Sequence, residues 1–198
     1  MYTKLAKILQ NNIVFTDSNG KMPFLTIRNT NQLACYIEAK DYDGNTRYLN
    51  PAIYEGNYEY VSGNVSGSSK GIIVGSGTTP ATEDDYCLEN KISGLSGSVV
   101  SNITGFDTTG NNYYSILNIT LTNNSASDVT VSEVGRIVNM YSAGSKGSTS
   151  VSNRYAFLLE RTVLDVPVTI EAGSSALIEY RVDYEPVEDP EPEPEPEP

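Results

Sequence analysis

The chain has 198 residues, with 13 Lys and Arg against 25 Asp and Glu, no histidine and no tryptophan, and a formal net charge of -12. This length allows one large β domain or two small ones, and the acidity disfavours phosphate backbones or anionic lipid as main partners. The absence of histidine removes Ser-His and Cys-His nucleophilic pairs, histidine metal sites and the commonest general base. We therefore expect no enzymatic activity and no cofactor.

The N-terminal segment, residues 1–12, is predicted to be a short amphipathic helix or arm. Leu5, Ile8 and Leu9 recur at helical spacing. Basic and polar residues interrupt this apolar pattern, so no signal-peptide core is expected. No stretch of the chain approaches the roughly 20 apolar residues that cross a bilayer, and we expect a soluble protein.

The next part of the chain, up to residue 71, contains strand and turn signals. Asn19-Gly20 tolerates the positive φ of a tight hairpin, which predicts flanking strands near 13–16 and 24–28. A further strand is expected over 33–39. Gly, Ser and Asn accumulate at 62–71, which predicts a long loop or a seam between two halves.

After residue 71 the pattern favours strands alone. Apolar and polar residues alternate in 115–122 and again in 176–184, as in strands with one buried face. Strands without intervening helices predict an all-β body over 13–184, an antiparallel β-sandwich of jelly-roll or Ig-like type. The strand-length runs are 72–74, 99–106, 113–122, 129–141, 155–161, 166–170 and 176–184.

The C-terminal segment, residues 185–198, alternates Glu and Pro. Eight acidic residues and no basic ones follow residue 182. Proline and charge repulsion favour an extended polyproline II rod, and a basic surface of a neighbouring protein is the expected partner. Glu191, Glu193, Glu195 and Glu197 are the candidate contact residues.

Tyrosines cluster before the predicted seam, and three of them, Tyr54, Tyr58 and Tyr60, are candidate interface residues. Protein interfaces and sugar sites both favour large rings with a polar tip. The lack of tryptophan weakens the sugar interpretation. Core or interface packing is preferred, and a receptor- or glycan-binding adhesin domain remains the alternative.

Several motifs are better explained by structure than by chemistry. Residues 41–45, Asp-Tyr-Asp-Gly-Asn, lack the glycine position and terminal Glu of a calcium loop, so an Asx-type turn is predicted. The acidic run 83–85 is expected to be a solvated loop or a cation contact, because adjacent carboxylates rarely form a catalytic pair. Cys35 and Cys87 are expected to be reduced and buried.

Residues 71–89, Gly-Ile-Ile-Val-Gly-Ser-Gly-Thr-Thr-Pro-Ala-Thr-Glu-Asp-Asp-Tyr-Cys-Leu-Glu, resemble a stretch typical of bacteriophage and prophage virion structural proteins. Residues 129–135 and 158–173 resemble later strands of the same family. The resemblance implies a β-sandwich virion component without catalytic residues. It also implies assembly in the host bacterial cytoplasm and self-association in a symmetric head, neck or tail structure.

In or next to the segments of this resemblance, one of two charge pairs is a candidate for polar contacts near the sheet edge. Glu133 is a candidate partner of Arg136, and Glu160 of Arg161. Ordinary surface charges are the preferred interpretation.

Overall fold

The computed structural model describes residues 1–6, 13–16, 24–27, 37–53, 61, 63–67, 69–109, 112–148 and 153–184. These residues are almost entirely strands, with one helical turn over residues 4–6. None of them belongs to a helix with the length and apolar character that a membrane crossing requires. The strands are β1 (Ile13–Thr16), β2 (Phe24–Ile27), β3 (Ile37–Lys40), β4 (Thr46–Ile53), β5 (Gly71–Gly75), β6 (Leu95–Asp107), β7 (Asn112–Asn123), β8 (Val129–Ala143), β9 (Asn153–Ile170) and β10 (Ser175–Tyr184).

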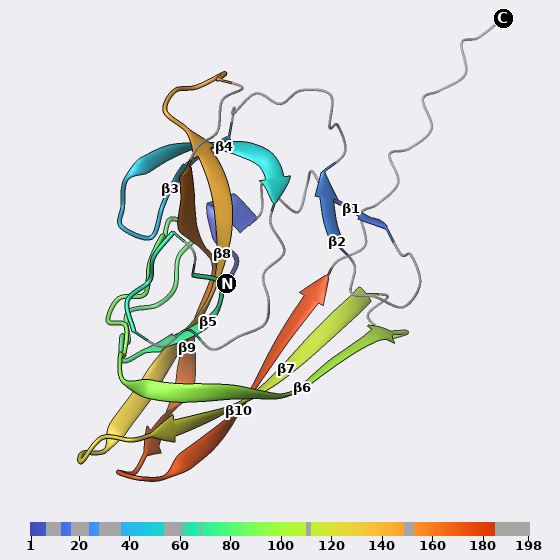
Figure 1. Cartoon of the computed structure of the whole chain (residues 1–198). Coiled ribbons are helices and arrows are strands. Elements are labelled where there is room, and N and C mark those ends of the chain that lie inside the picture. Colours follow the sequence, from blue (N-terminus) through green and yellow to red (C-terminus); the bar gives the residue numbers. More distant parts are fainter. Residues whose placement is uncertain are drawn as a thin grey trace, which may run out of the picture.

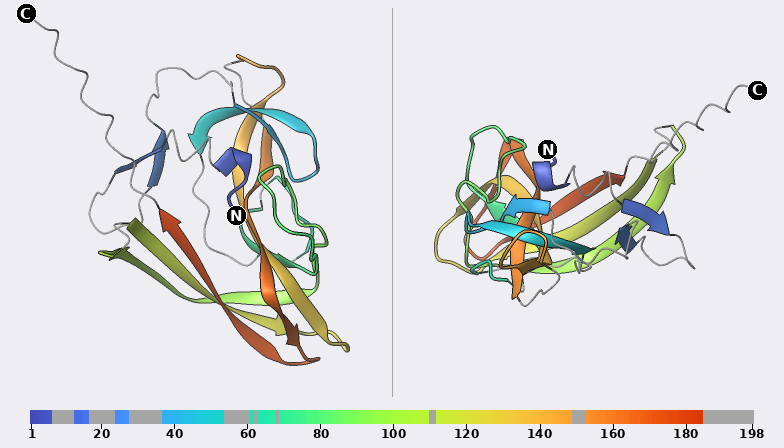
Figure 2. Two further views of the ribbon diagram at one scale, coloured as in Figure 1. Left: turned by 180° about the vertical axis from the view of Figure 1, so that it is seen from behind. Right: turned by 90° about the horizontal axis from the view of Figure 1, so that it is seen from above.

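The strands form two main antiparallel sheets that pack against each other (Figure 1). The larger sheet has the order β3-β4-β8-β5, and β8 also pairs with β9. The smaller sheet has the order β10-β7-β6, and β1 and β2 form a separate pair. The views from behind and from above show the smaller sheet extending past the larger one (Figure 2). The predicted all-β antiparallel sandwich is confirmed.

The main core lies between the two sheets and follows the predicted alternation. Leu117, Ile119 and Leu121 of β7 are at most 1% exposed, whereas the intervening polar residues are partly exposed. They pack with Ile72 and Val74 of β5 from the facing sheet. Burial of one apolar face of each sheet therefore holds the sandwich together.

The N-terminal residues extend the larger sheet along β9. The Thr3 N–H donates to the Leu159 carbonyl at 2.9 Å, and the Arg161 N–H donates to the Met1 carbonyl at 3.1 Å. Leu5, in the helical turn, is buried in a second apolar cluster with Phe157 of β9. The predicted helix or arm is thus seen as a docked segment up to residue 6, and residues 7–12 lie outside the described residues.

β9 is one long strand, although two separate strands were predicted for this part of the chain. Its register with β8 passes from Val163 opposite Glu133 to Val168 opposite Val131. One residue of β8 therefore faces four of β9, and Pro167 lies among these extra residues. Because proline has no N–H to donate, an irregularity of this kind tolerates it without ending the strand.

β4 has no counterpart among the predicted strands. It pairs with both β3 and β8, but its register with β8 shifts between Leu49 and Ile53, where Pro51 lies. β5, at the end of the predicted 62–71 seam, belongs to the same sheet as β3 and β4, so one sheet contains strands from both sides of that seam.

The turn at residues 41–45 is the predicted Asx-type turn. Asp41 is buried, and its Oδ1 accepts the N–H groups of Asp43 at 3.1 Å and Asn45 at 2.8 Å. Its Oδ2 accepts Nε of Arg47 at 2.7 Å. Gly44 has a φ of 83°, which an L side chain would strain. The carboxylate of Asp41 thus stabilises the turn.

Candidate functional site

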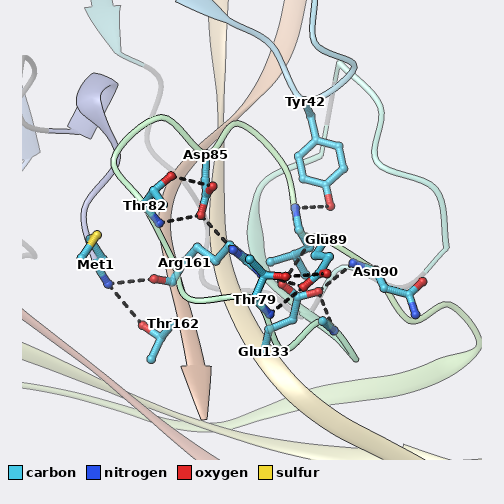
Figure 3. A network of polar contacts seen from close by, with 12 residues as sticks. Met1, Tyr42, Thr79, Thr82, Asp85, Glu89, Asn90, Glu133, Arg161 and Thr162 are labelled. Atoms are coloured by element: carbon cyan, nitrogen blue, oxygen red, sulfur yellow. Dashed lines mark hydrogen bonds and ion pairs between the residues drawn. The ribbon is translucent and has the colours of Figure 1, made fainter.

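The loop of residues 76–91, which follows β5, lies over β8 and β9 and is held there by a polar network (Figure 3). This loop contains most of the 71–89 segment, on which the expected relation to virion proteins rests. The chain direction reverses within it, and side chains supply partners for those of its backbone N–H groups that other backbone groups do not bind.

Glu133 of β8 is the centre of this network. Its side chain is 0% exposed, and Oε1 accepts the N–H groups of Gly77 at 3.0 Å and Asn90 at 2.8 Å. Oε2 accepts the N–H of Glu89 at 3.2 Å and Nε of Arg161 at 2.7 Å. One carboxylate therefore binds both ends of the loop, and its buried charge is balanced by the guanidinium.

Arg161 of β9 binds the loop from the other side. Its Nη1 lies 2.9 Å from Oδ2 of Asp85, and its Nη2 lies 3.4 Å from Oε2 of Glu89. Burial disfavours the charged guanidinium, but hydrogen bonds with Asp85 and Glu133 outweigh this cost and raise the pKa of Arg161 above its usual value. The arginine therefore stays charged and links both strands to the loop.

Asp85 is held as an anion within the loop. Burial alone would raise its pKa, but the Thr82 N–H and the Arg161 guanidinium together lower it below the usual value. Thr82 binds Asp85 through its N–H at 3.0 Å and its hydroxyl at 2.9 Å. Thr79 binds Glu89 in the same way, at 2.9 and 2.8 Å. Each threonine thus fixes one acid of the loop.

Gly75 and Gly77 are required by the close approach of the loop backbone to neighbouring atoms. A Cβ on Gly75 would lie 2.3 Å from Oε1 of Glu133 and 2.7 Å from the Asn90 carbonyl. A Cβ on Gly77 would lie 2.6 Å from the same Oε1 and 2.5 Å from Cβ of Glu89. Only glycine lets the backbone come within hydrogen-bond distance of the buried carboxylate.

Leu88 anchors the far end of the loop in a third apolar cluster. It packs with Ile73, Ile137 and Leu158, and its N–H donates to Oη of Tyr42 at 3.3 Å. Burial raises the pKa of Tyr42, so its hydroxyl stays neutral. The loop is therefore fixed by an apolar contact as well as by the ion pair.

A second buried ion pair lies on the opposite face of β8 and β9. Nη2 of Arg136 is 2.5 Å from Oε1 of Glu160, and the Tyr180 hydroxyl donates to Oε2 of the same carboxylate. Burial and the nearby carboxylate raise the pKa of Tyr180 well above its usual value. Since Tyr180 belongs to the core between the sheets, this pair connects the two sheets.

The predicted charge pairs are wrong in both partner and environment. Glu133 pairs with Arg161 and Arg136 pairs with Glu160, and the four side chains are buried or nearly so. Successive residues of a strand point to opposite faces, so Glu160 and Arg161 cannot share one site. Arg136 and Glu160 are direct cross-strand partners instead. Antiparallel pairing, which sequence spacing does not encode, decides the partners.

The acidic run 83–85 borders an open cleft of about 440 Å³ between the N-terminal segment, β3 and the loop. Oδ1 of Asp84 lies 2.9 Å from Nζ of Lys4, and both side chains are exposed. Asp84 and Asp85 thus contact cations of the same chain, as predicted for a cation contact. Among the described residues, no three His, Cys, Asp or Glu side chains could share a metal ion.

The tyrosines Tyr54, Tyr58 and Tyr60 and the tail glutamates Glu191, Glu193, Glu195 and Glu197 lie outside the described residues. Their role as interface residues stays a prediction, and so does the glycan-binding alternative. Of the two cysteines, Cys87 is described. It is a free, half-buried thiol whose pKa is raised by burial.

Fold and site together define an all-β sandwich in which one long loop is fixed by a buried Glu-Arg pair. No protein-family model matches the chain, and no curated protein or solved structure was found to be similar to it. The contacts described above are therefore the basis for the function proposed next.

Proposed function

We propose that the chain is a non-enzymatic structural subunit of a protein assembly, and that this assembly is a bacteriophage or prophage virion. The subunit acts through contacts with copies of itself and with other virion proteins, at the head, the neck or the tail. The resemblance of residues 71–89, 129–135 and 158–173 supports the virion part of the proposal.

The observation that carries the proposal is a group of exposed apolar side chains on one strand, β6. Val99, Val100, Ile103 and Phe106 are 40%, 62%, 50% and 46% exposed. Val99 and Phe106 point to one face of the sheet and Ile103 points to the other, as their partners on β7 show. Exposed apolar side chains on both faces of one edge strand favour a contact made along that strand. A protein that works by contact needs such a surface.

The buried polar groups favour a structural role over catalysis. Glu133 and Glu160 each have an arginine and further N–H or O–H donors, and Asp85 is bound by Arg161 and Thr82. A general base must be able to reach substrate and exchange a proton. These carboxylates instead use their lone pairs to hold the fold.

The acidic tail fits the same role. It places many carboxylates on a Pro-rich segment with no basic residue. Such a segment is attracted to a basic surface on a neighbouring virion protein and repelled by nucleic acid. We therefore propose protein partners, with neither nucleic acid nor membrane as the target.

Mass spectrometry of particles purified by density gradient, from the phage or induced prophage that encodes the chain, tests the proposal. We expect the protein to co-purify with the major capsid protein through a high-salt wash and at a constant ratio to it across the gradient. An abundant host protein measured in the same fractions is the control for contamination. Absence from the particles, or a distribution that follows the host protein, would refute the virion role.

A further inference from the structure

β6 is a long edge strand that pairs on one side. It has 13 residues, and within the described part of the chain only β7 pairs with it. An edge strand presents backbone N–H and C=O groups in the arrangement that another strand can bind. Proteins usually protect such edges with charged residues, proline or very short strands.

The sequence of β6 has none of these charged or proline residues before its last position. The strand reads Leu-Ser-Gly-Ser-Val-Val-Ser-Asn-Ile-Thr-Gly-Phe-Asp, and Asp107 is its one charged residue. β10, the opposite edge of the same sheet, carries Glu179, Arg181 and Asp183 on its outward face. One edge of the smaller sheet is therefore protected by charge, and the other has no charge before Asp107.

The pairing of β6 with β7 shifts once, at Val100, which has no partner in the register. After this bulge the register is regular from Ser101 to Asp107, with Ile103 opposite Ile116. This regular half of the strand contains two of its exposed apolar side chains, Ile103 and Phe106. It is the half that can accept a further strand without another irregularity.

We propose that β6 pairs with β6 of a second copy of this chain, in an antiparallel two-fold dimer that joins two three-stranded sheets into one six-stranded sheet. The occupant is a second copy because a strand that pairs antiparallel with itself is automatically matched by two-fold symmetry. Charge supports this choice. β6 has no charged residue before Asp107, so two copies can meet along it without placing like charges opposite each other.

The register of this dimer follows from the regular half of the strand. With the two-fold axis at Ile103, each Ile103 lies opposite its own copy, and Asn102 lies opposite Thr104 of the second copy. Ser101 then lies opposite Gly105 of the second copy, so no charges oppose each other. Apolar cross-strand pairs such as Ile opposite Ile stabilise antiparallel sheets. The proposed dimer deepens the proposed function. It rests on that function only for the place of the dimer in a larger assembly.

Sedimentation equilibrium of the purified full-length chain over about 1–100 µM tests the pairing, because dimers with micromolar or lower dissociation constants are populated in that range. We expect twice the monomer mass for the native chain and the monomer mass for Ile103→Lys. Leu177→Lys is the matched control, since Leu177 is 65% exposed on the same sheet but on β10. We expect it to remain a dimer. Circular dichroism and a thermal melt establish that both variants are folded.

A cross-link tests the register independently. Under mild oxidation Ile103→Cys should form a disulfide-linked dimer on a non-reducing gel, because opposite residues of an antiparallel pair lie within disulfide range. Leu177→Cys and the native chain, with its own two cysteines, give the background. A monomeric native chain, a dimer that persists in Ile103→Lys, or a dimer lost equally in Leu177→Lys would overturn the proposal. None of these results bears on the presence of the protein in virions, so the two proposals can fail separately.

Discussion

Replacing Glu133 by glutamine tests whether the buried ion pair holds the loop 76–91. The substitution keeps the shape of the side chain but removes its charge. Glu133 accepts three backbone N–H groups and Nε of Arg161 without exposure to solvent. The NH2 group of glutamine is itself a donor, so one side of the amide would face N–H groups that need an acceptor.

The size of the effect follows from what remains around Arg161. Removing one partner of a buried ion pair typically costs about 3–5 kcal/mol, because the other charge is left buried. Here Asp85 and Glu89 still contact the guanidinium, at 2.9 and 3.4 Å, and partly compensate. We therefore expect a loss near the lower end, about 3 kcal/mol, out of a total stability of about 5–15 kcal/mol for a typical domain.

Equilibrium unfolding in urea, followed by circular dichroism and tyrosine fluorescence, measures this loss. The control is Asp84→Asn, which removes an acid from the same loop. Its ion pair with Lys4 is exposed on both sides, 77% for the Asp84 side chain and 66% for that of Lys4, so its loss should change the stability little. Hydrogen exchange should also show faster exchange of the Gly77 and Asn90 amides in Glu133→Gln. Equal, small losses in the two variants would refute the role assigned to the buried pair.

Three further predictions concern the loop and the tail. Gly77→Ala should destabilise the chain by about 1–3 kcal/mol, because its Cβ would press on the buried carboxylate of Glu133. Gly144→Ala is the control, since a Cβ there meets nothing within 4 Å, and it should change the urea midpoint little. Asp85 has a lowered pKa in the folded state, so its contribution is present above its unfolded-state pKa near 4 and is lost as pH falls through the folded value. Asp85→Asn should therefore be less stable than the native chain at pH 7 and lose less stability on acidification, and parallel pH profiles of the urea midpoint would contradict this. Deletion of residues 189–198 should leave the melting temperature nearly unchanged but weaken association with particles, and the weakening should be greatest at low salt. A loss of association that does not depend on salt would exclude charge attraction.

The strands could be predicted where one face is buried and the other is exposed to solvent. In β7, Leu117, Ile119 and Leu121 alternate with polar residues, and the structure buries these three side chains. β10 shows the same pattern, with Tyr180 and Val182 buried. A period of two is a local property of a strand, so the sequence contains it directly.

The elements that were missed depend on pairing between distant segments. β4 contains Pro51 and is completed by contacts with β8, far away in the sequence. The partners of Glu133 and Glu160 are likewise decided by the register of β8 with β9, which places Arg136 opposite Glu160 and Gly135 opposite Arg161. Four charged residues within two segments of strand-forming sequence are a signal that indicates buried ion pairs. Buried strands carry charge only when a partner is available on the same face.

The buried network also brings together segments that are far apart in the sequence. Residues 71–89, 129–135 and 158–173, on which the proposed relation to virion proteins rests, meet at this one site. The first supplies the loop, the second supplies Glu133, and the third supplies Arg161. The N–H groups of Gly77, Glu89 and Asn90 face β8 and need a buried acceptor there, and a buried carboxylate needs a cation. Proteins that share the loop pattern should therefore carry the Glu and the Arg on two later strands as well, and a chain with the loop but without that pair would have to satisfy the same N–H groups in another way.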